Sequence, residues 1–491
     1  MSKSYYLTTT LPYVNSKPHV GFALEIIQAD AIARYHKALG EEIFFNTGTD
    51  EHGKKIYEKA IEEGKDPQAY TDEYAAKFDA LKSSLNLSYN HFIRTTNPHH
   101  KQAAQELWKR CEQNGYIEKG TYEAKYCVGC ELEKTDSDLV EGKCLLHPNK
   151  EIELIKEENY FFKFSDPRIQ KALLAHMDKY SDFVVPAHRQ KEIRNFVESG
   201  LQDFSISRLK DKMPWGVEVP NDSKHVMYVW FDALTNYIST IGWPSSAEAS
   251  AGIPSEFEKF WGTKEQPQAV QIAGKDNLRQ QSSMWQAMLF AGDLPLTRQI
   301  LIHGFITSGG QKMSKSLGNV IDPLEYSEKY GVDALRYYLL AKVSPFEDSD
   351  FTKEKFEEVY KSDLQNGLGN LVSRIVSLAS KTGRNYRDIL NSYDINSTEN
   401  KSIRFDIENY RFNTALSSIW SLITHFNVII SEQKAWTDPV KNEGLIADYV
   451  SGLSRICSGL SPFMPDTVDT IVQIFSNDKL EKAKPIFPRL T

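Results

Sequence analysis

The chain opens with short apolar runs separated by a helical pattern. Residues 5–10, Tyr-Tyr-Leu-Thr-Thr-Thr, are aromatic and β-branched, which is typical of a strand. From residue 22 to residue 39, apolar side chains recur at helical spacing, and Gly40 follows as a stop signal. Residues 43–45, Ile-Phe-Phe, indicate another short strand. A strand, a turn, a helix and a strand in this order predict the start of a doubly wound parallel α/β sheet.

Similar strand patterns return only after a long stretch that is rich in charges and cysteines. We expect strands at residues 226–231, 269–273 and 299–303. The gap before them predicts an insertion between two halves of a nucleotide-binding sheet. Such an insertion leaves the sheet at the carboxyl edge of the strands, where ligands bind in open sheets.

Beyond Asp350 the pattern becomes helical, and no convincing strand interrupts it. The apolar spacing predicts amphipathic helices at residues 360–381, 403–433, 445–458 and 466–475. A helical bundle is therefore expected, with the polar residues 385–400 as a connector.

Composition changes this picture little. With 491 residues, 41% hydrophobic and 25% charged, the chain is expected to be a multidomain soluble protein. The net charge of −8 means that a nucleic-acid partner would need a local basic surface. No apolar run approaches the roughly 18 residues that a membrane span needs, and no signal pattern opens the chain. Five cysteines favour a reducing cytoplasm over a disulfide scaffold.

Two short motifs suggest phosphate chemistry. Residues 312–316, Lys-Met-Ser-Lys-Ser, follow the pair Gly309-Gly310, so two ammonium groups lie on a glycine-hinged loop. Such a loop can neutralise a leaving pyrophosphate, although a lysine-serine-glycine run alone is more often a solvated loop. The second motif is residues 18–22, Pro-His-Val-Gly-Phe, at the start of the first predicted helix. A histidine there adds a donor to the amides and dipole of the helix N-terminus; the alternative is a turn histidine with a packing glycine.

Together these motifs resemble the two signatures of the class I aminoacyl-tRNA synthetases. Phe22 departs from the first signature, which ordinarily ends in histidine. The neighbouring residues narrow the resemblance to the methionyl-tRNA synthetase family. They are Leu-Pro-Tyr at 11–13, Thr-Asp-Glu-His-Gly at 49–53, Tyr-Val-Trp-Phe-Asp-Ala at 228–233 and Gly-Lys-Asp at 274–276.

The resemblance covers nearly the whole chain and implies a domain plan. A Rossmann-like parallel sheet, split by a zinc-bearing insertion, is followed by an α-helical anticodon-binding bundle. The expected units are 1–97 and 227–305 for the two catalytic halves, 98–226 for the insertion, 306–352 for the signature loop and stem-contact region, and 353–491 for the bundle.

For the ATP site, the resemblance implies catalytic roles for His19, Gly21, Lys312 and Lys315, with Phe22 and Ser314 also touching ATP. The attacking carboxylate of an amino acid is already ionised, so alignment and charge stabilisation replace a general base. Magnesium is expected to accompany ATP, held mainly by the phosphates.

For the amino acid, the resemblance implies that Asp50 holds the substrate ammonium. The side-chain slot would be lined by Leu11, Tyr13, Trp230, Ala233, Leu234, Tyr237, Asn277 and Gln281. Aromatic walls suit a thioether, although isolated aromatics are more often ordinary core residues. Leu234, Asn277 and Gln281 depart from the common family pattern, and the last two make the slot more polar.

The cysteine cluster is a strong metal signal by itself. Cys127 and Cys130 are two residues apart, and Cys144 and His147 repeat that spacing. Two such knuckles predict a Cys₃His zinc site with no open coordination position, which is therefore structural. Unpaired buried thiols are the alternative.

In the helical part, Asn370 and Arg374 lie one turn apart, and Trp436 follows near a helix end. They match the anticodon-reading residues of the family, which fits recognition of splayed bases by stacking and edge hydrogen bonds. A solvated amphipathic face with a tryptophan cap is the alternative.

The expected enzyme is a cytoplasmic, monomeric methionine–tRNA ligase. It would form methionyl-adenylate from methionine and ATP, then charge tRNA(Met), releasing AMP and pyrophosphate. Two alternatives stay open: a class I synthetase for another apolar amino acid, and a non-catalytic tRNA-binding relative.

Overall fold

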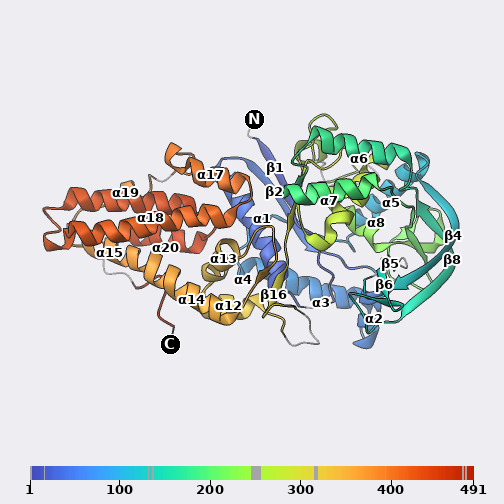
Figure 1. Ribbon diagram of the computed structural model, residues 1–491, viewed down its shortest axis with the longest axis horizontal. Helices are drawn as coiled ribbons and strands as arrows, with labels where there is room; N and C mark the ends of the chain where they lie inside the picture. Colours follow the sequence, from blue (N-terminus) through green and yellow to red (C-terminus); the bar gives the residue numbers. More distant parts are fainter. Residues whose placement is uncertain are drawn as a thin grey trace.

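The molecule is elongated, with a parallel sheet between a helical bundle and a β-rich insertion (Figure 1). The computed structural model describes residues 3–490 except 16, 131, 135–137, 245–255, 314–318, 393, 478–479 and 481–483. The bundle, coloured orange to red, forms one end of Figure 1, and the green and teal insertion forms the other. The sheet in the middle contacts both parts.

The central sheet has six parallel strands in the order β3-β2-β1-β14-β15-β9. The strands are β1 (Ser4–Thr8), β2 (Glu42–Thr49), β3 (His91–Arg94), β9 (Val184–Val185), β14 (Val270–Gly274) and β15 (Gln299–His303). The chain order reverses between β1 and β14, which is the topological switch point where doubly wound sheets bind ligands. The predicted parallel α/β sheet is therefore confirmed.

Local sequence explains the opening unit. Helix α1 (Val20–Ala38) follows His19, whose side chain caps the helix, and most of its apolar positions between Val20 and Tyr35 are buried. The chain then turns at Gly40, with φ of 80°, and enters β2. Because strands β1 and β2 pair in parallel, the helix must cross over between them.

The strand predicted at residues 226–231 is wrong in its second half. Strand β13 (Asp222–Met227) ends at Met227 and belongs to a three-stranded antiparallel sheet, and helix α8 (Val229–Leu234) follows directly. Val229 and Phe231 are both buried, so the run is apolar on every side. Periodicity cannot separate a strand from a helix in such a run. The sequence also gave no signal for β3 and β9, which complete the sheet at its two edges.

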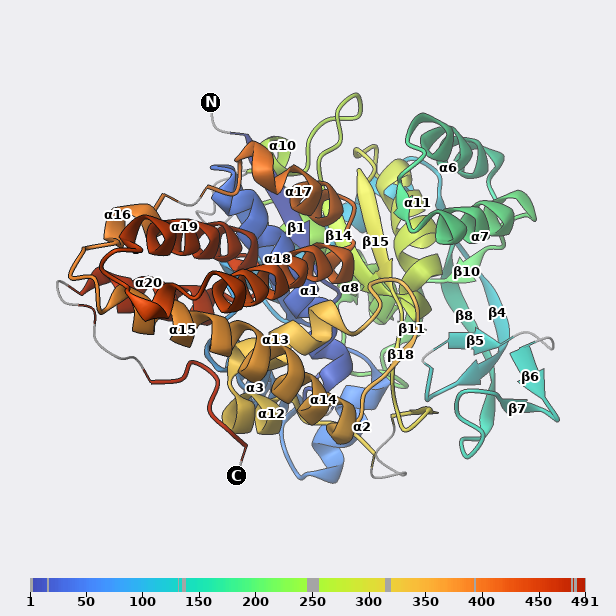
Figure 2. The ribbon, with the colours of Figure 1, turned by 60° about the vertical axis from the view of Figure 1, so that its left-hand side comes forward.

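The insertion is built on a long antiparallel pair. Strands β4 (Ile117–Cys127) and β8 (Ile152–Phe162) pair along their full lengths, from Ile117 with Phe162 to Cys127 with Ile152. The cysteine cluster lies at the far end of this pair, beside the two-stranded β6 (Leu139–Val140) and β7 (Lys143–Cys144) (Figure 2). The expected domain boundaries remain predictions, and β9, within the range expected for the insertion, belongs to the central sheet.

A small sheet carries the second signature. Strand β16 (Ile306–Ser308) pairs antiparallel with β17 (Gln311–Lys312) and parallel with β18 (Ser349–Asp350). The turn between β16 and β17 is Gly309-Gly310, with φ of 61° and 76°. Positive φ at both central residues is what a type I′ hairpin needs, and glycine adopts it freely.

The helical bundle confirms the predicted class of the C-terminal part, with one break. Residues 360–379 are helical, as η5 (Tyr360–Gly369) and α15 (Asn370–Ala379), and α19 (Glu443–Leu460) and α20 (Pro465–Ser476) match the last two predicted helices. The predicted helix 403–433 is two helices, α17 (Lys401–Glu408) and α18 (Phe412–Gln433). The chain breaks at Tyr410, whose φ is 57°, a left-handed value that no α-helix accommodates. The predicted connector also contains the short helix α16 (Arg387–Leu390), whose Leu390 is buried.

One helix differs from the expectation about membranes. Helix α18 is long and apolar enough to cross a bilayer by length and composition. It packs, however, against α17, α19 and α13 (Val332–Ala341), and Figure 1 shows it lying within the bundle.

Candidate active site

The site begins where β1 and β2 end. Beyond β1, Tyr13 forms an isolated parallel bridge with Asp50, and Asp50 N–H donates to the carbonyl of Pro12 at 3.0 Å. This pairing carries residues 11–13 onto the Thr-Asp-Glu-His-Gly segment. Two motifs that are distant in sequence therefore meet at the carboxyl edge of the sheet, and Asp50 is buried there at 3% exposure.

His19 takes up a defined orientation at the start of α1. Its Nδ1 accepts a hydrogen bond from the Gly21 N–H at 3.1 Å, so Nε2 carries the proton and is the donor of the ring. Partial desolvation lowers the pKa of His19, which keeps Nδ1 available as an acceptor. A Cβ on Gly21 would lie 2.9 Å from His19 Cε1, so glycine is required because the imidazole packs against this position.

The two signature regions lie side by side. A Cβ placed on Gly21 would lie 3.9 Å from Cε of Met313, and the Val20 N–H at the start of α1 donates to the carbonyl of Ile321 at 3.0 Å. Chain on both sides of the lysine loop therefore touches the N-terminus of α1. A ligand held at that N-terminus lies within reach of the loop.

Of the loop itself, Lys312 and Met313 are described, whereas Ser314 and Lys315 lie outside the described residues. The Lys312 Nζ lies 5.6 Å from the centre of the Phe305 ring, and Asn319 Nδ2 donates to the Lys312 carbonyl at 3.3 Å. Phe22, in contrast, packs its ring edge-on against Phe78 at 5.4 Å between centres. The phenylalanine thus fills a hydrophobic contact with α3 (Pro67–Asp79).

A buried acid beside this site was not predicted from the sequence. Glu25 Oε1 accepts hydrogen bonds from Thr10 N and Oγ1 at 2.7 and 2.6 Å, and its Oε2 lies 2.9 Å from His303 Nε2. Burial alone lowers the pKa of His303, but the bond and charge of Glu25 outweigh it and raise the pKa. The cluster ties α1, the loop after β1 and the end of β15 together. A charged residue in an otherwise apolar helix face was the signal that could have revealed Glu25.

The expected amino-acid slot gathers around Tyr237. Residues Trp230, Ala233 and Leu234 lie on α8, and Tyr237 follows on the short α9 (Asn236–Ser239). Gln281 lies opposite, in the π-helical turn η3 (Gln280–Met284), and its Nε2 donates to the Tyr237 hydroxyl at 2.6 Å. Tyr237 and Gln281 are 2% and 1% exposed, so this bond is shielded from water. Asn277 is less central, because its Nδ2 bonds the neighbouring Asp276 at 3.4 Å.

Polar atoms around this slot have partners left over. Trp230 Nε1, Gln281 Oε1, Gln280 Oε1 and Ser282 Oγ are buried without a hydrogen-bond partner among the described residues. Buried polar groups are ordinarily paired, so these atoms indicate a place for a ligand or ordered water. That this region binds the amino acid stays a prediction.

A second unpredicted network supports the same floor. Asp232 lies between two histidines, 2.6 Å from His52 Nδ1 and 2.8 Å from His100 Nε2. His100 also bonds Ser239 Oγ at 2.9 Å, and all four side chains are buried. Although burial raises it, the two histidines lower the pKa of Asp232 well below its usual range. The network joins the Thr-Asp-Glu-His-Gly segment to α8 and α9, which fixes Asp50 relative to the slot.

The four predicted metal ligands come together. The ligand atoms of Cys127, Cys130, Cys144 and His147 all lie within 4.8 Å of one another. The Cys130 Sγ lies 3.5 Å from the Cys144 Sγ and 3.2 Å from the His147 Nδ1. Around a tetrahedral zinc, sulfur atoms at about 2.3 Å from the metal are about 3.7 Å apart, so this donor set fits the ion. A Cβ on Gly129 would come within 2.5 Å of the His147 ring, which explains the glycine in the first knuckle.

The three residues expected to read an anticodon lie in the bundle. Arg374 donates to the Asn427 carbonyl at 2.8 Å and to Ser431 Oγ at 2.9 Å, and Asn370 donates to Asn427 Oδ1 at 3.1 Å. Trp436 lies just beyond α18, in η7 (Ala435–Thr437), and is 45% exposed. Asn427 and Ser431, which sequence reasoning missed, hold Asn370 and Arg374 in place.

Comparison with known proteins agrees with this geometry. The family model described as tRNA synthetases class I (M) matches residues 5–151 and 133–376. A methionine–tRNA ligase of Nostoc sp. is 40% identical over 96% of this chain and 89% of its own length. One from Fusobacterium nucleatum is 36% identical over 100% of this chain and 80% of its own.

Solved structures give the same result. A methionyl-tRNA synthetase of Mycobacterium tuberculosis in complex with methionyl-adenylate superposes with a TM-score of 0.87 at 32% identity. The match covers 99% of this chain and 100% of that one. The chain belongs to the methionine–tRNA ligase family of the class I aminoacyl-tRNA synthetases.

Proposed function

We propose that the chain activates methionine with ATP and transfers it to the 3′ end of tRNA(Met), releasing pyrophosphate and AMP. The observation that carries the proposal is the contact between the N-terminus of α1 and both sides of the lysine loop, at the switch point of the sheet. A triphosphate at that place would meet a helix N-terminus, the Nε2 donor of His19 and the Lys312 ammonium.

In the activation step, the methionine carboxylate attacks the α-phosphorus of ATP. The new bond is carboxyl oxygen to phosphorus, and the bond that breaks releases pyrophosphate. No proton has to leave the attacking group, so the residues act by alignment and charge. His19 and the amides near Gly21 would hold the phosphates, while Lys312 and Lys315 would neutralise the leaving pyrophosphate, with Ser314 as a further donor.

The substrate side of the site would be arranged from Asp50 to Tyr237. The buried Asp50 carboxylate suits an ammonium group, since a charge-assisted hydrogen bond stabilises both charges. Leu11, Tyr13, Trp230, Ala233 and Leu234 would enclose the thioether, and the Gln281–Tyr237 pair would close the slot.

We propose zinc for the cysteine cluster, in a structural role. Four protein ligands leave no place for a substrate, so the ion would hold the tip of the β4–β8 pair together. Magnesium would arrive with ATP and be held mainly by its phosphates.

The transfer step needs the tRNA. Asn370 and Arg374 present donors on one helix face, and Trp436 offers an exposed ring on which an anticodon base can stack.

We also propose a monomer that works in the cytoplasm, a reducing compartment that suits the buried free thiols of Cys111 and Cys457.

The deciding experiment is amino-acid-dependent exchange of labelled pyrophosphate into ATP, run across all standard amino acids. The proposal predicts strong exchange with methionine alone. Exchange with another apolar amino acid would indicate a different class I specificity, and no exchange with any amino acid would indicate a non-catalytic relative.

A further inference from the structure

The segment that precedes helix α14 (Lys353–Val359) supports the hairpin that carries the lysine signature. Residues 347–350 run alongside residues 304–308, and a Cβ on Gly304 would lie 2.2 Å from the carbonyl carbon of Glu347. Ser349 N–H donates to the Phe305 carbonyl at 2.9 Å, and Phe351 N–H donates to the Thr307 carbonyl at the same distance. The hairpin is therefore held from one side along its first strand.

Asp350 holds the turn of this hairpin. Its Oδ1 accepts a hydrogen bond from the Gly310 N–H at 2.7 Å and another from Thr307 Oγ1 at 2.9 Å. Its Oδ2 lies 3.4 Å from the Lys355 Nζ. Two of the three donors belong to the hairpin: Thr307 lies in its first strand and Gly310 in its turn. The backbone bond from Gly310 is the main cause that lowers the pKa of Asp350, so the carboxylate is ionised at neutral pH.

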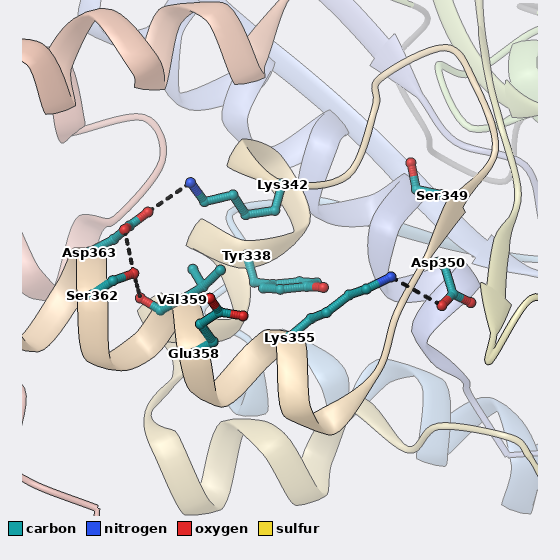
Figure 3. Close-up of a pocket in the computed structure, with 9 residues that line it drawn as sticks. All are labelled: Tyr338, Lys342, Ser349, Asp350, Lys355, Glu358, Val359, Ser362 and Asp363. Carbon is teal, nitrogen blue, oxygen red and sulfur yellow. Dashed lines mark hydrogen bonds and ion pairs between the residues drawn. The ribbon is translucent and has the colours of Figure 1, made fainter.

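Asp350 lines a cavity of about 450 Å³ together with two other acidic residues, Glu358 and Asp363 (Figure 3). Asp363 lies at the other side of the cavity and pairs with Lys342 at 2.7 Å. Glu358 lines the same cavity on α14 and is exposed. Among the described residues, Asp350 is the one of these three carboxylates that accepts hydrogen bonds from the hairpin.

From these contacts we propose that Asp350 is a positioning residue that fixes the β16–β17 hairpin, and hence Lys312, for the activation step. A glycine-glycine turn has no side chains to restrict it, so an external acceptor is needed to define its orientation. Asp350 supplies that acceptor from β18, next to the bundle. The inference rests on the proposed function for its catalytic consequence, but its structural part stands alone.

The test compares Asp350→Ala with Glu358→Gln, a matched loss of one carboxylate from the same cavity. Trypsin cleavage after Lys312, followed by mass spectrometry, reports hairpin order without using the activity. We expect cleavage to be about tenfold faster in Asp350→Ala and unchanged in Glu358→Gln, since hydrogen bonds to a charged acceptor are among the stronger ones. In methionine-dependent pyrophosphate exchange, we expect the kcat of Asp350→Ala to fall about tenfold. Its KM for ATP should rise, and its KM for methionine should stay unchanged.

Two further variants keep the test decisive. If Asp350→Ala unfolds, Asp350→Asn retains one acceptor oxygen and Thr307→Val removes only one donor, so both should give smaller effects in the same direction. Wild-type cleavage in a folded Asp350→Ala protein would overturn the inference, as would faster cleavage with unchanged exchange. Faster cleavage in a protein that shows no exchange even as wild type would instead reject the proposed function and keep the structural role.

Discussion

The Gln281–Tyr237 hydrogen bond offers the sharpest test of the amino-acid slot. Gln281 Nε2 donates to the Tyr237 hydroxyl oxygen at 2.6 Å, so the hydroxyl proton is left to point at another acceptor. A thioether sulfur is a weak acceptor, whereas the methylene of norleucine is none. The pair would therefore favour methionine over norleucine.

Replacing Gln281 with methionine keeps the volume and removes the donor. Both side chains are at most 2% exposed, so the hydroxyl is left without its partner and out of water. An unsatisfied buried group costs about 1–3 kcal/mol. The substitution also removes Gln281 Oε1, which has no partner among the described residues, so part of this cost is offset. We expect a net fall of about 1 kcal/mol in the free energy of unfolding measured with denaturant. With the hydroxyl free to rotate, discrimination between methionine and norleucine should fall about tenfold, or ~1.4 kcal/mol, in pyrophosphate exchange.

The matched background is Tyr237→Phe, which lacks the hydroxyl. There, Gln281→Met should change discrimination little, because the interaction is already absent. If Gln281→Met leaves both stability and discrimination at wild-type values, or if its effect is equal in the two backgrounds, the reasoning about this pair is wrong.

Four other predictions address separate parts of the molecule. Metal analysis after gentle purification should find about one zinc per chain, and Cys144→Ser should lose it; a metal-free wild type would contradict the site. Lys315→Ala should lower adenylation by about a hundredfold or more with the fold intact by circular dichroism, and near-normal pyrophosphate exchange would argue against its role. Trp436→Ala should weaken tRNA aminoacylation and spare adenylate formation, whereas equal losses would show a structural role. Burial raises the pKa of Asp333 to about 6, so its contribution to stability is complete below about pH 4 and is lost as the pH rises through 6. Asp333→Asn, which can still accept the bond from Thr467 N–H, should flatten thermal stability over that window, and an unchanged profile would exclude this origin.

Features that depend on residues close together in the sequence were predicted well. The helix that starts at His19, the Gly40 turn and the last two helices depend on neighbouring residues, and they form as predicted. The cysteine knuckles are also local, since each pair of ligands spans one turn of chain. The spacing therefore predicts the two ligands of each knuckle, and the folded chain brings the two knuckles together.

Signals failed where burial on several sides removed the periodicity. Residues 229–231 are helical, although their uniform apolar pattern fits a strand equally well. The break at Tyr410 depends on where α17 and α18 pack, and no glycine or proline marks it. The sequence likewise gave no reason to place β9 at the edge of the central sheet.

By itself, the sequence determined which chemical groups the chain carries and which helices and strands their neighbours favour. Only the tertiary structure decided which groups meet: Val20 with Ile321, Glu25 with His303, Gln281 with Tyr237, and Asp350 with the Gly310 turn. Helix and turn preferences act within a few residues, so they can be recognised in the order of the amino acids. Strand pairing and side-chain contacts join residues up to hundreds of positions apart, and their energies exist only once the chain has closed those distances.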